Sequence, residues 1–208
     1  MHMLRLLLTV ALIGVPLAAT ADVIPAPPPG YNPATWNGGP RVRPYDNRSA
    51  AILLDGIRRS ATFRSIIEKV ESRDVIAYVQ IQPTLKGRLA GGLTWLTGTR
   101  RFRYVRIGIN PDLRGDAAIA ALGHELQHAL EVAGEPSIVD EHSFATHYKQ
   151  VGISVRMHQN GWDTEAARQA GDDVRRDLVG SGMRAMESVR DFDPNTWHVA
   201  YRRARGVL

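Results

Sequence analysis

The sequence predicts an α+β domain in which an N-terminal helix, a short antiparallel or mixed sheet and a pair of antiparallel helices share one core. Apolar residues recur at helical spacing between Ser49 and Glu71, two β-rich runs flank Gly98-Thr99, and a long helical run follows. A chain of 208 residues, 44% of them hydrophobic, can bury one such core but is too short for two large domains.

Residues 1–21 have the features of a secretory signal peptide. Arg5 supplies a positive start, residues 6–17 supply an apolar run, and residues 19–21 read A-T-A, a small-residue cleavage site. A membrane anchor is the alternative, but a spanning helix needs roughly 20 apolar residues. We therefore predict cleavage before Asp22, no membrane span in the mature protein, and a location in the bacterial periplasm or outside the cell.

The composition limits the chemistry that an exported form can use. The chain has no cysteine, so neither a disulfide framework nor a thiolate ligand is possible, and a metal must be held by His, Glu or Asp. The formal net charge of +5 is a mild basic excess. Arg101 and Arg103 alternate with Phe102 and Tyr104, but on an exported protein we expect an exposed sheet face there and no nucleic-acid partner.

Residues 22–48 form a Pro/Gly-rich arm that excludes a regular helix or a central strand. The arm is interpreted as a linker, an inhibitory pro-segment, or a strap in which Tyr31, Trp36 and Tyr45 offer side chains to bury. A single domain then spans residues 49–208.

The domain begins with a helix from Ser49 to about Glu71, in which Asp55-Gly56 is a possible break. A strand follows at residues 75–81. Residues 93–97 and 102–109 are then predicted to form a hairpin around Gly98-Thr99.

A long helix is predicted from Asp116, as its N-cap, to about Ala133. Ser137 with Asp140 resembles a capping box, so a second helix should run to about Tyr148. A short strand at residues 153–157, a charged helix capped by Asp163 or Thr164 and ending near Val179, and an Arg-rich tail from Pro194 complete the chain.

The long helix contains the pentapeptide HExxH, from His124 to His128. The two His side chains lie one turn apart on one face, so their imidazoles can share one Zn²⁺, and Glu125 can act as a general base. The alternative is that both imidazoles only hydrogen-bond within a helix pair. The opposite face is apolar and should pack on the sheet; it consists of Ile119, Leu122, Leu126 and Leu130. Small residues that permit close approach of another element flank the imidazoles: Ala117, Ala120 and Ala121.

The third ligand is expected from the second helix, which offers Asp140, Glu141, His142 and His147. Glu141 falls in the middle of an apolar stripe, where an unpaired carboxylate is costly, and in an antiparallel pair it lies at the depth of His128. We therefore predict Glu141 as the ligand, with Asp140 and His147 as alternatives and an exposed Glu141 as the opposing interpretation.

Glu131 is a rival ligand because it shares the face of the two imidazoles. It and His124 span about 10 Å of one helix, an awkward reach around a single ion. We expect Glu131 instead to orient His128 from behind.

At these residues the chain resembles the HExxH zinc metallopeptidases, the zincins, and within them the branch that uses a downstream Glu. Residues 121–129, ALGHELQHA, also resemble the motif helix of small exported bacterial proteins of uncharacterised function. The resemblance covers residues 105–150. It implies a zincin-like fold, zinc held by His124, His128 and Glu141, Glu125 as the base, and extended substrate bound along the edge of the preceding strand.

The sequence departs from the family pattern in three ways. The spacing from His128 to Glu141 is shorter than in the thermolysin-like group, and that group's Asn-Glu-x-x-Ser-Asp motif is missing. In the branch with a third His ligand, the motif reads HExxHxxGxxH; here Glu131 stands in place of its Gly and Gly134 in place of its last His. Tyr148 and His147 are candidates for stabilising an oxyanion.

Together these features predict an exported zinc-dependent hydrolase, more narrowly a metallopeptidase acting on peptide or protein substrates of the cell envelope. The alternative is a non-catalytic envelope protein with a structural or inert metal site.

Overall fold

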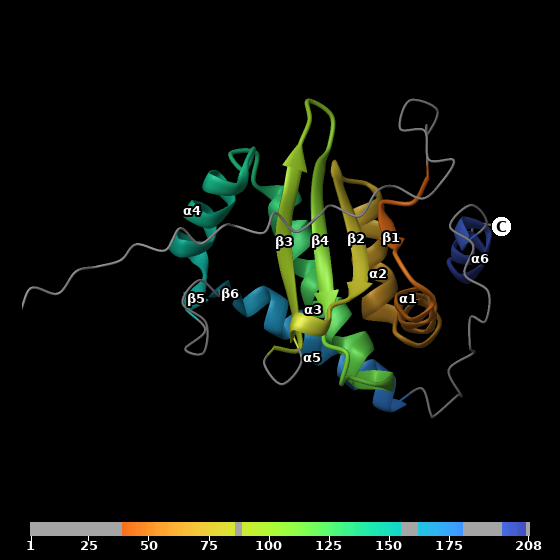
Figure 1. Cartoon of the computed structure of the whole chain (residues 1–208). Helices are drawn as coiled ribbons and strands as arrows, with labels where there is room; N and C mark the ends of the chain where they lie inside the picture. The colour runs from red at the N-terminus through yellow and green to blue at the C-terminus, as the bar shows by residue number, and fades with distance from the viewer. Residues whose placement is uncertain (1–38, 86–88, 155–161, 181–196, 207–208) are drawn as a thin grey trace, which may run out of the picture. The chain divides into compact units, whose positions relative to one another are not determined.

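The computed structural model describes residues 39–85, 89–154, 162–180 and 197–206, all of which belong to one compact unit. The predicted signal peptide and most of the Pro/Gly-rich arm lie outside these residues. The described chain is α+β, as predicted, with a small mixed sheet whose one face is covered by helices (Figure 1). None of the described helices combines the length and apolar character that a membrane span requires.

The main sheet has the strand order β1-β2-β4-β3. β1 (Val42–Pro44), β2 (Val75–Ile81) and β4 (Arg103–Ile109) run parallel, whereas β3 (Gly91–Gly98) pairs antiparallel with β4. The predicted strand and hairpin are therefore confirmed. The arm ends in β1, at the edge of the sheet, where a proline is tolerated. The domain thus begins before Ser49.

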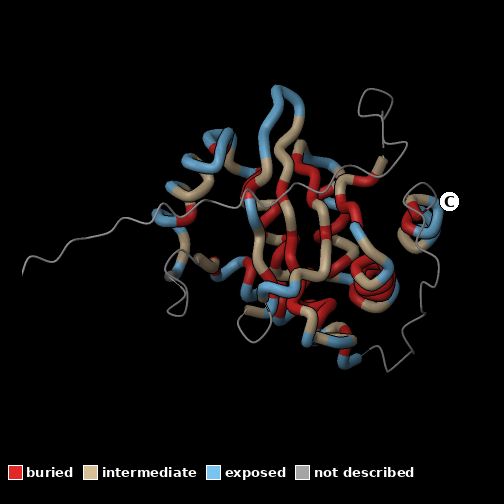
Figure 2. Tube along the Cα trace, viewed as in Figure 1, coloured by how far each residue is buried: buried red, intermediate tan, exposed pale blue. Residues whose placement is uncertain are grey.

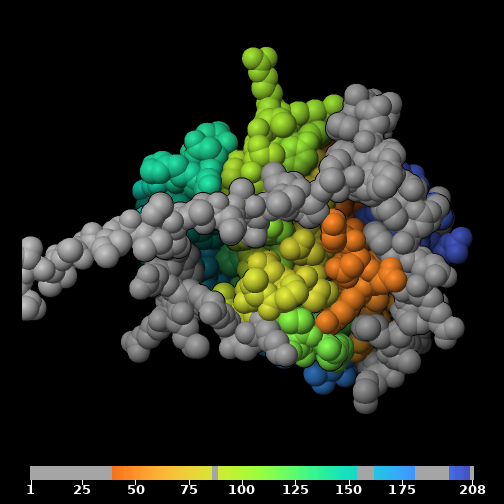
Figure 3. All heavy atoms as spheres, viewed as in Figure 1, coloured from red at the N-terminus to blue at the C-terminus, as the bar shows by residue number. Residues whose placement is uncertain are grey.

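The end of the β3–β4 hairpin projects above helix α4 on the face shown in Figure 3. Arg100 and Arg101 are exposed there. The guanidinium of Arg101 lies 5.1 Å from the centre of the Phe102 ring, and that of Arg41 lies 4.3 Å from it. These contacts place two basic side chains, one from the hairpin and one from the segment before β1, on the aromatic ring of Phe102.

Two helices, α1 (Asn47–Arg59) and α2 (Ala61–Glu71), follow β1. The chain breaks between them at Ser60, whose side chain accepts a hydrogen bond from the backbone N–H of Phe63, and not at Asp55-Gly56 as predicted. Gly56 lies inside α1, where a Cβ atom would come within 3.0 Å of Ile119 and Phe63. This glycine therefore serves close helix packing.

The chain passes from β2 through a short 3-10 turn, η1 (Pro83–Leu85), into the hairpin and then into the central helix α3 (Gly115–Gly134). On the predicted apolar side of α3, Ile119, Leu122 and Leu126 are fully buried and Leu130 is half-buried. The helix contacts β2, β3 and β4 of the sheet and also α1, α2 and α5. The predicted N-cap at Asp116 is wrong. Arg114 is the cap, Gly115 opens the helix at a φ of 48°, and Asp116 pairs with Arg59 at 2.8 Å.

Helix α4 (Glu141–Val151) lies beside the free edge of β3. It begins later than predicted, because Asp140 is its N-cap and forms the capping box with Ser143, not with Ser137. This shift moves Glu141 to the first turn of the helix, where it is exposed.

The C-terminal part begins with a small ribbon of β5 (Ile153–Ser154) and β6 (Trp162–Asp163). The rest of the strand predicted for residues 153–157 lies outside the described residues. Helix α5 (Glu165–Gly180) follows β6 and packs along α3. A further helix, α6 (Trp197–Ala204), was not predicted; its buried Tyr201 donates a 2.7 Å hydrogen bond to Glu71 at the end of α2.

The core lies between the sheet and the helices, where the buried residues concentrate in Figure 2. A polar group is buried within this layer: Glu125, His128 and Thr164 are all less than 9% exposed. Burying polar side chains is costly unless they have partners, so this group marks a candidate site.

Candidate metal centre

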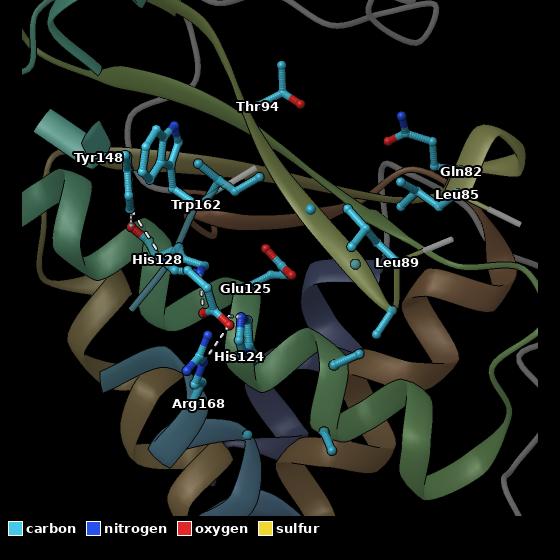
Figure 4. A pocket seen from close by; sticks show the side chains of 18 of the residues that line it. Gln82, Leu85, Leu89, Thr94, His124, Glu125, His128, Tyr148, Trp162 and Arg168 are labelled. Carbon is cyan, nitrogen blue, oxygen red and sulfur yellow. Dashed lines mark hydrogen bonds and ion pairs between the residues drawn. The ribbon is translucent and has the colours of Figure 1, made fainter. Parts of the chain in front are cut away.

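The two imidazoles of the HExxH helix lie together, as their spacing on α3 predicts. Their ring centres are 5.0 Å apart, with the planes tilted by 75°. His128 is buried and His124 is about one quarter exposed, so the pair sits where the helix emerges from the core into a cleft. Figure 4 shows both rings at the floor of this cleft.

Asp163 supplies the third donor. Its Oδ1 lies 3.2 Å from Nε2 of His124 and 3.6 Å from Nε2 of His128. Within the described ranges, His124, His128 and Asp163 form the group of His and acidic side chains that could hold a metal ion, with all donor atoms within 4.8 Å of one another. Asp163 comes from β6, immediately before α5, and not from α4 as expected.

Two of the three distances between these donors match the spacing expected around a tetrahedral ion. Zinc ligands lie about 2.0–2.2 Å from the metal, which places two ligands of a tetrahedron about 3.4 Å apart. The two distances to Asp163 Oδ1 bracket that value. Two imidazole nitrogens and one carboxylate oxygen are also ligand types that zinc accepts, and they leave one position open.

Glu131 fixes the orientation of His128. Its Oε2 is 2.8 Å from Nδ1 of His128, so that nitrogen is engaged and Nε2 is directed toward Asp163. Two hydroxyl groups hold Glu131 in turn: Thr164 donates to Oε1 at 2.6 Å and Tyr148 donates to Oε2 at 3.2 Å. A carboxylate behind a metal-binding imidazole sets its tautomer and raises its basicity, which is the position expected for Glu131 from the helix spacing.

Glu125 is buried beside the imidazoles. Its carboxylate points into the cleft (Figure 4) and packs against the start of β3, where a Cβ atom on Gly91 would come within 2.8 Å of Oε1. Glycine at position 91 therefore leaves the space that this carboxylate occupies. Burial raises the pKa of Glu125 to about 7, which is a suitable value for a general base near neutral pH.

Electrostatic coupling shifts the other groups in opposite directions. Burial lowers the pKa of His124, and the neighbouring His128 lowers it further. Burial would also lower the pKa of His128, but the carboxylates of Asp163 and Glu131 outweigh it and raise the pKa to about 10. Burial opposes the ionisation of Asp163, yet His128 and Arg168 hold its pKa below the usual range. The carboxylates of Asp163 and Glu131 thus favour positive charge on His128, which lies between them.

The cleft in front of these groups has a volume of about 1160 Å³. Its lining includes the aliphatic residues Leu85, Leu89 and Leu113 and the aromatic residues Trp95, Phe144, Tyr148 and Trp162. Figure 4 shows Leu85 and Leu89 on one side of Glu125, and Tyr148 and Trp162 on the other.

Of the remaining predicted residues, Glu141, Asp140 and His147 do not belong to the donor group, whereas Tyr148 packs against His128. Glu141 is exposed on the rim of the cleft and does not belong to the donor group, so the premise of a buried Glu141 is wrong. Asp140 is exposed and caps α4. His147 packs edge-on against Tyr148, at 5.4 Å between ring centres. The hydroxyl of Tyr148 lies 3.2 Å from both Glu131 Oε2 and the backbone oxygen of His128.

Two signals in the sequence could have pointed to Asp163. Asp163 and Thr164 are adjacent candidates for one N-cap, and Thr164 takes that role by accepting from the N–H of Ala167. Asp163 is then left for another function. The buried face of α5 also carries Ala167, Ala170 and Gly171, which match the small residues beside His124.

Comparison of the chain with models of protein families, with curated proteins and with solved structures finds no match.

Proposed function

We propose that the protein is a zinc-dependent hydrolase, and more narrowly a metallopeptidase, of the bacterial cell envelope. The observation that carries this proposal is the gathering of His124, His128 and Asp163, with donor atoms within 4.8 Å of one another, beside a buried carboxylate that faces an open cleft. A divalent ion bound there would lower the pKa of a coordinated water and polarise a carbonyl group.

Glu125 takes the part of the general base. Its carboxylate stands on the cleft side of the imidazoles, and its raised pKa lets it accept a proton from water and pass it to a leaving amine at neutral pH. Glu131 and Tyr148 keep His128 in position from behind. In this proposal Glu125 is the base, the donor group of His124, His128 and Asp163 holds the ion, and Glu131 and Tyr148 orient His128.

A peptide substrate is favoured by the free edge of β3. Gly91 to Trp95 line the cleft along this edge strand, whose outward backbone groups can pair with an extended peptide. The strand that directly precedes the motif helix is β4, but it lies inside the sheet between β2 and β3. The role that the resemblance gave to the preceding strand thus passes to β3.

The second candidate function is an inert metal site in a binding or structural protein. It is favoured by the hydrogen bonds of Tyr148, which commit its hydroxyl to Glu131 and to His128 and leave it unsuited to an oxyanion. Burial and Glu131 also raise the pKa of Tyr148, so the phenol stays neutral.

The test compares Glu125→Gln with Glu141→Gln in the purified protein. Both substitutions replace a carboxyl group of the cleft by an amide, but only Glu125 adjoins the imidazoles. We expect about one zinc per chain in both variants by elemental analysis. We expect digestion of a peptide library to fall by about 10²- to 10⁴-fold in Glu125→Gln alone, the usual effect of losing a general base.

Hydrolysis that survives in Glu125→Gln would refute this mechanism. Zinc binding without hydrolysis by the unmodified protein would instead support the inert site. A protein that binds no zinc would exclude both functions.

A further inference from the structure

The two carboxylate oxygens of Asp163 have different partners. Oδ1 faces the imidazoles and also accepts a 2.8 Å hydrogen bond from the backbone N–H of Thr164. Oδ2 accepts a 2.8 Å hydrogen bond from Nε of Arg168. The carboxylate is therefore held at both ends, and only one oxygen is directed toward the position of an ion.

Arg168 reaches this carboxylate from the first turns of α5. Its backbone N–H donates to the carbonyl of Thr164 at 3.1 Å, so the helix itself sets the distance between Arg168 and Asp163. The side chain is 42% exposed and lines the cleft. Figure 4 shows the guanidinium of Arg168 beside His124.

We propose that Arg168 is a positioning residue that restricts Asp163 to binding the metal through Oδ1 alone. The proposal rests on the metal site of the proposed function. A carboxylate without such a partner can turn and present both oxygens to a cation, as bidentate acidic ligands do. With Oδ2 occupied by Arg168, Asp163 would offer a single oxygen to a bound ion, which would leave a coordination position for water or substrate.

An arginine suits this role better than a lysine. The Nε–H group has a fixed direction in the plane of the guanidinium, whereas an ammonium is a mobile point charge on a flexible stem. The hydrogen bond to a charged acceptor is also stronger than a neutral one, so it holds the carboxylate in one rotamer.

Arg175 provides a matched control. It lies two turns further along α5, lines the same cleft, and pairs with Asp172 at 2.5 Å, but neither residue belongs to the donor group. Arg168→Ala and Arg175→Ala therefore remove the same charge from the same helix, and only the first frees Asp163.

The test measures zinc affinity by competition with a chelator and the visible spectrum of the protein loaded with Co²⁺, which reports coordination geometry. We expect Arg168→Ala to bind zinc about 10- to 100-fold more weakly, the usual effect of losing a partner behind a ligand, and to alter the Co²⁺ spectrum. Arg168→Lys should recover part of the affinity but not the spectrum. Arg175→Ala should match the unmodified protein in both.

Unchanged zinc affinity and an unchanged Co²⁺ spectrum in Arg168→Ala would overturn the proposal while leaving the metal site intact. The same holds if only KM for peptides changes, since Arg168 would then contact substrate. If Arg168→Ala fails to fold, Arg168→Lys decides: a Co²⁺ spectrum identical to that of the unmodified protein refutes the role. Failure of the unmodified protein to bind zinc would remove the site itself.

Discussion

Helices α4 and α5 both flank the cleft, yet they contribute to it in different ways. α4 follows α3 directly in the chain, but most of its residues are exposed or half-buried, and Tyr148 is its one buried residue. α5 comes later, and its buried face packs closely along α3 through Ala167, Ala170 and Gly171. Asp163, the carboxylate that completes the donor group with the two imidazoles, lies just before α5, which is the closely packed helix.

The difference shows that closeness in sequence is a poor guide to which side chains gather at the candidate metal centre. A ligand from another element must come within about 3.4 Å of the imidazole nitrogens, which requires backbones to approach closely. Small residues permit that approach: a Cβ atom on Gly171 would already lie 3.3 Å from Cβ of His124. α4 instead presents Phe144 and Tyr148, whose rings pack 4.9 Å apart between it and the site.

The largest expected effect comes from substituting, one at a time, the two candidates for the third ligand, Asp163 and Glu141. Asp163→Asn removes the charge of the donor that faces both imidazoles, so zinc affinity should fall by at least about 100-fold, more than loss of a supporting partner costs. Glu141→Gln should leave affinity within about threefold, because Glu141 is exposed on the rim. Titration of zinc against a chelator measures both. Equal losses of zinc affinity in the two variants would contradict the conclusion that the donor comes from the start of α5 and not from α4.

A smaller effect should follow from disturbing the packing of α5. Gly171→Leu places a side chain against His124 and the backbone of Ala120, and overpacking of this kind costs roughly 1–3 kcal/mol. The better helix preference of Leu offsets part of that cost. Thr146→Leu, on the exposed side of α4, should change the free energy of unfolding by less than about 0.5 kcal/mol. Urea unfolding followed by circular dichroism compares the two; a destabilised Thr146→Leu and a neutral Gly171→Leu would reverse the assignment of the closely packed helix.

The smallest effect concerns the far end of α5. Asp177 accepts hydrogen bonds of 2.8 Å from the Ser60 hydroxyl and from the Thr62 N–H, and so ties α5 to the start of α2. Burial opposes its ionisation, but these hydrogen bonds outweigh burial and hold the pKa of Asp177 below its usual value. Asp177→Asn should therefore cost about 0.5–1 kcal/mol at neutral pH.

The pH dependence of this effect has a definite sign. A carboxyl group with a lowered pKa in the folded state stabilises the fold above its unfolded pKa of about 3.9 and loses that contribution as pH falls. The stability difference between the two proteins should be constant above about pH 5 and shrink below pH 4. A difference that grows on acidification would show that Asp177 is not ionised in the fold.

Much of the fold was predictable because its signals are local. The β-rich composition of β2, the turn at Gly98-Thr99 and the helical spacing of α3 each depend on neighbouring residues. The positions of His124, Glu125 and His128 follow from one helix, and the contact of Glu131 with His128 follows from the same helix.

The third ligand was not predictable in this way. The interpretation of Glu141 as buried depended on where α4 begins. The N-cap of α4 is Asp140 and not Ser137, and Glu141 is consequently exposed in the first turn. Asp163 depended on how α5 packs on α3, which no local pattern specifies. Likewise, the ordering of the sheet that makes β3 its edge arises from pairing between distant segments.

The position of Asp163 has a consequence for the stability of the chain. An ion shared by α3 and the start of α5 would join segments more than thirty residues apart, and because the unfolded chain has no such site, its binding free energy would add to the free energy of unfolding. Since the chain has no cysteine, the ion would act as its removable cross-link. The availability of metal where the protein folds would then help to determine how long it survives proteolysis there.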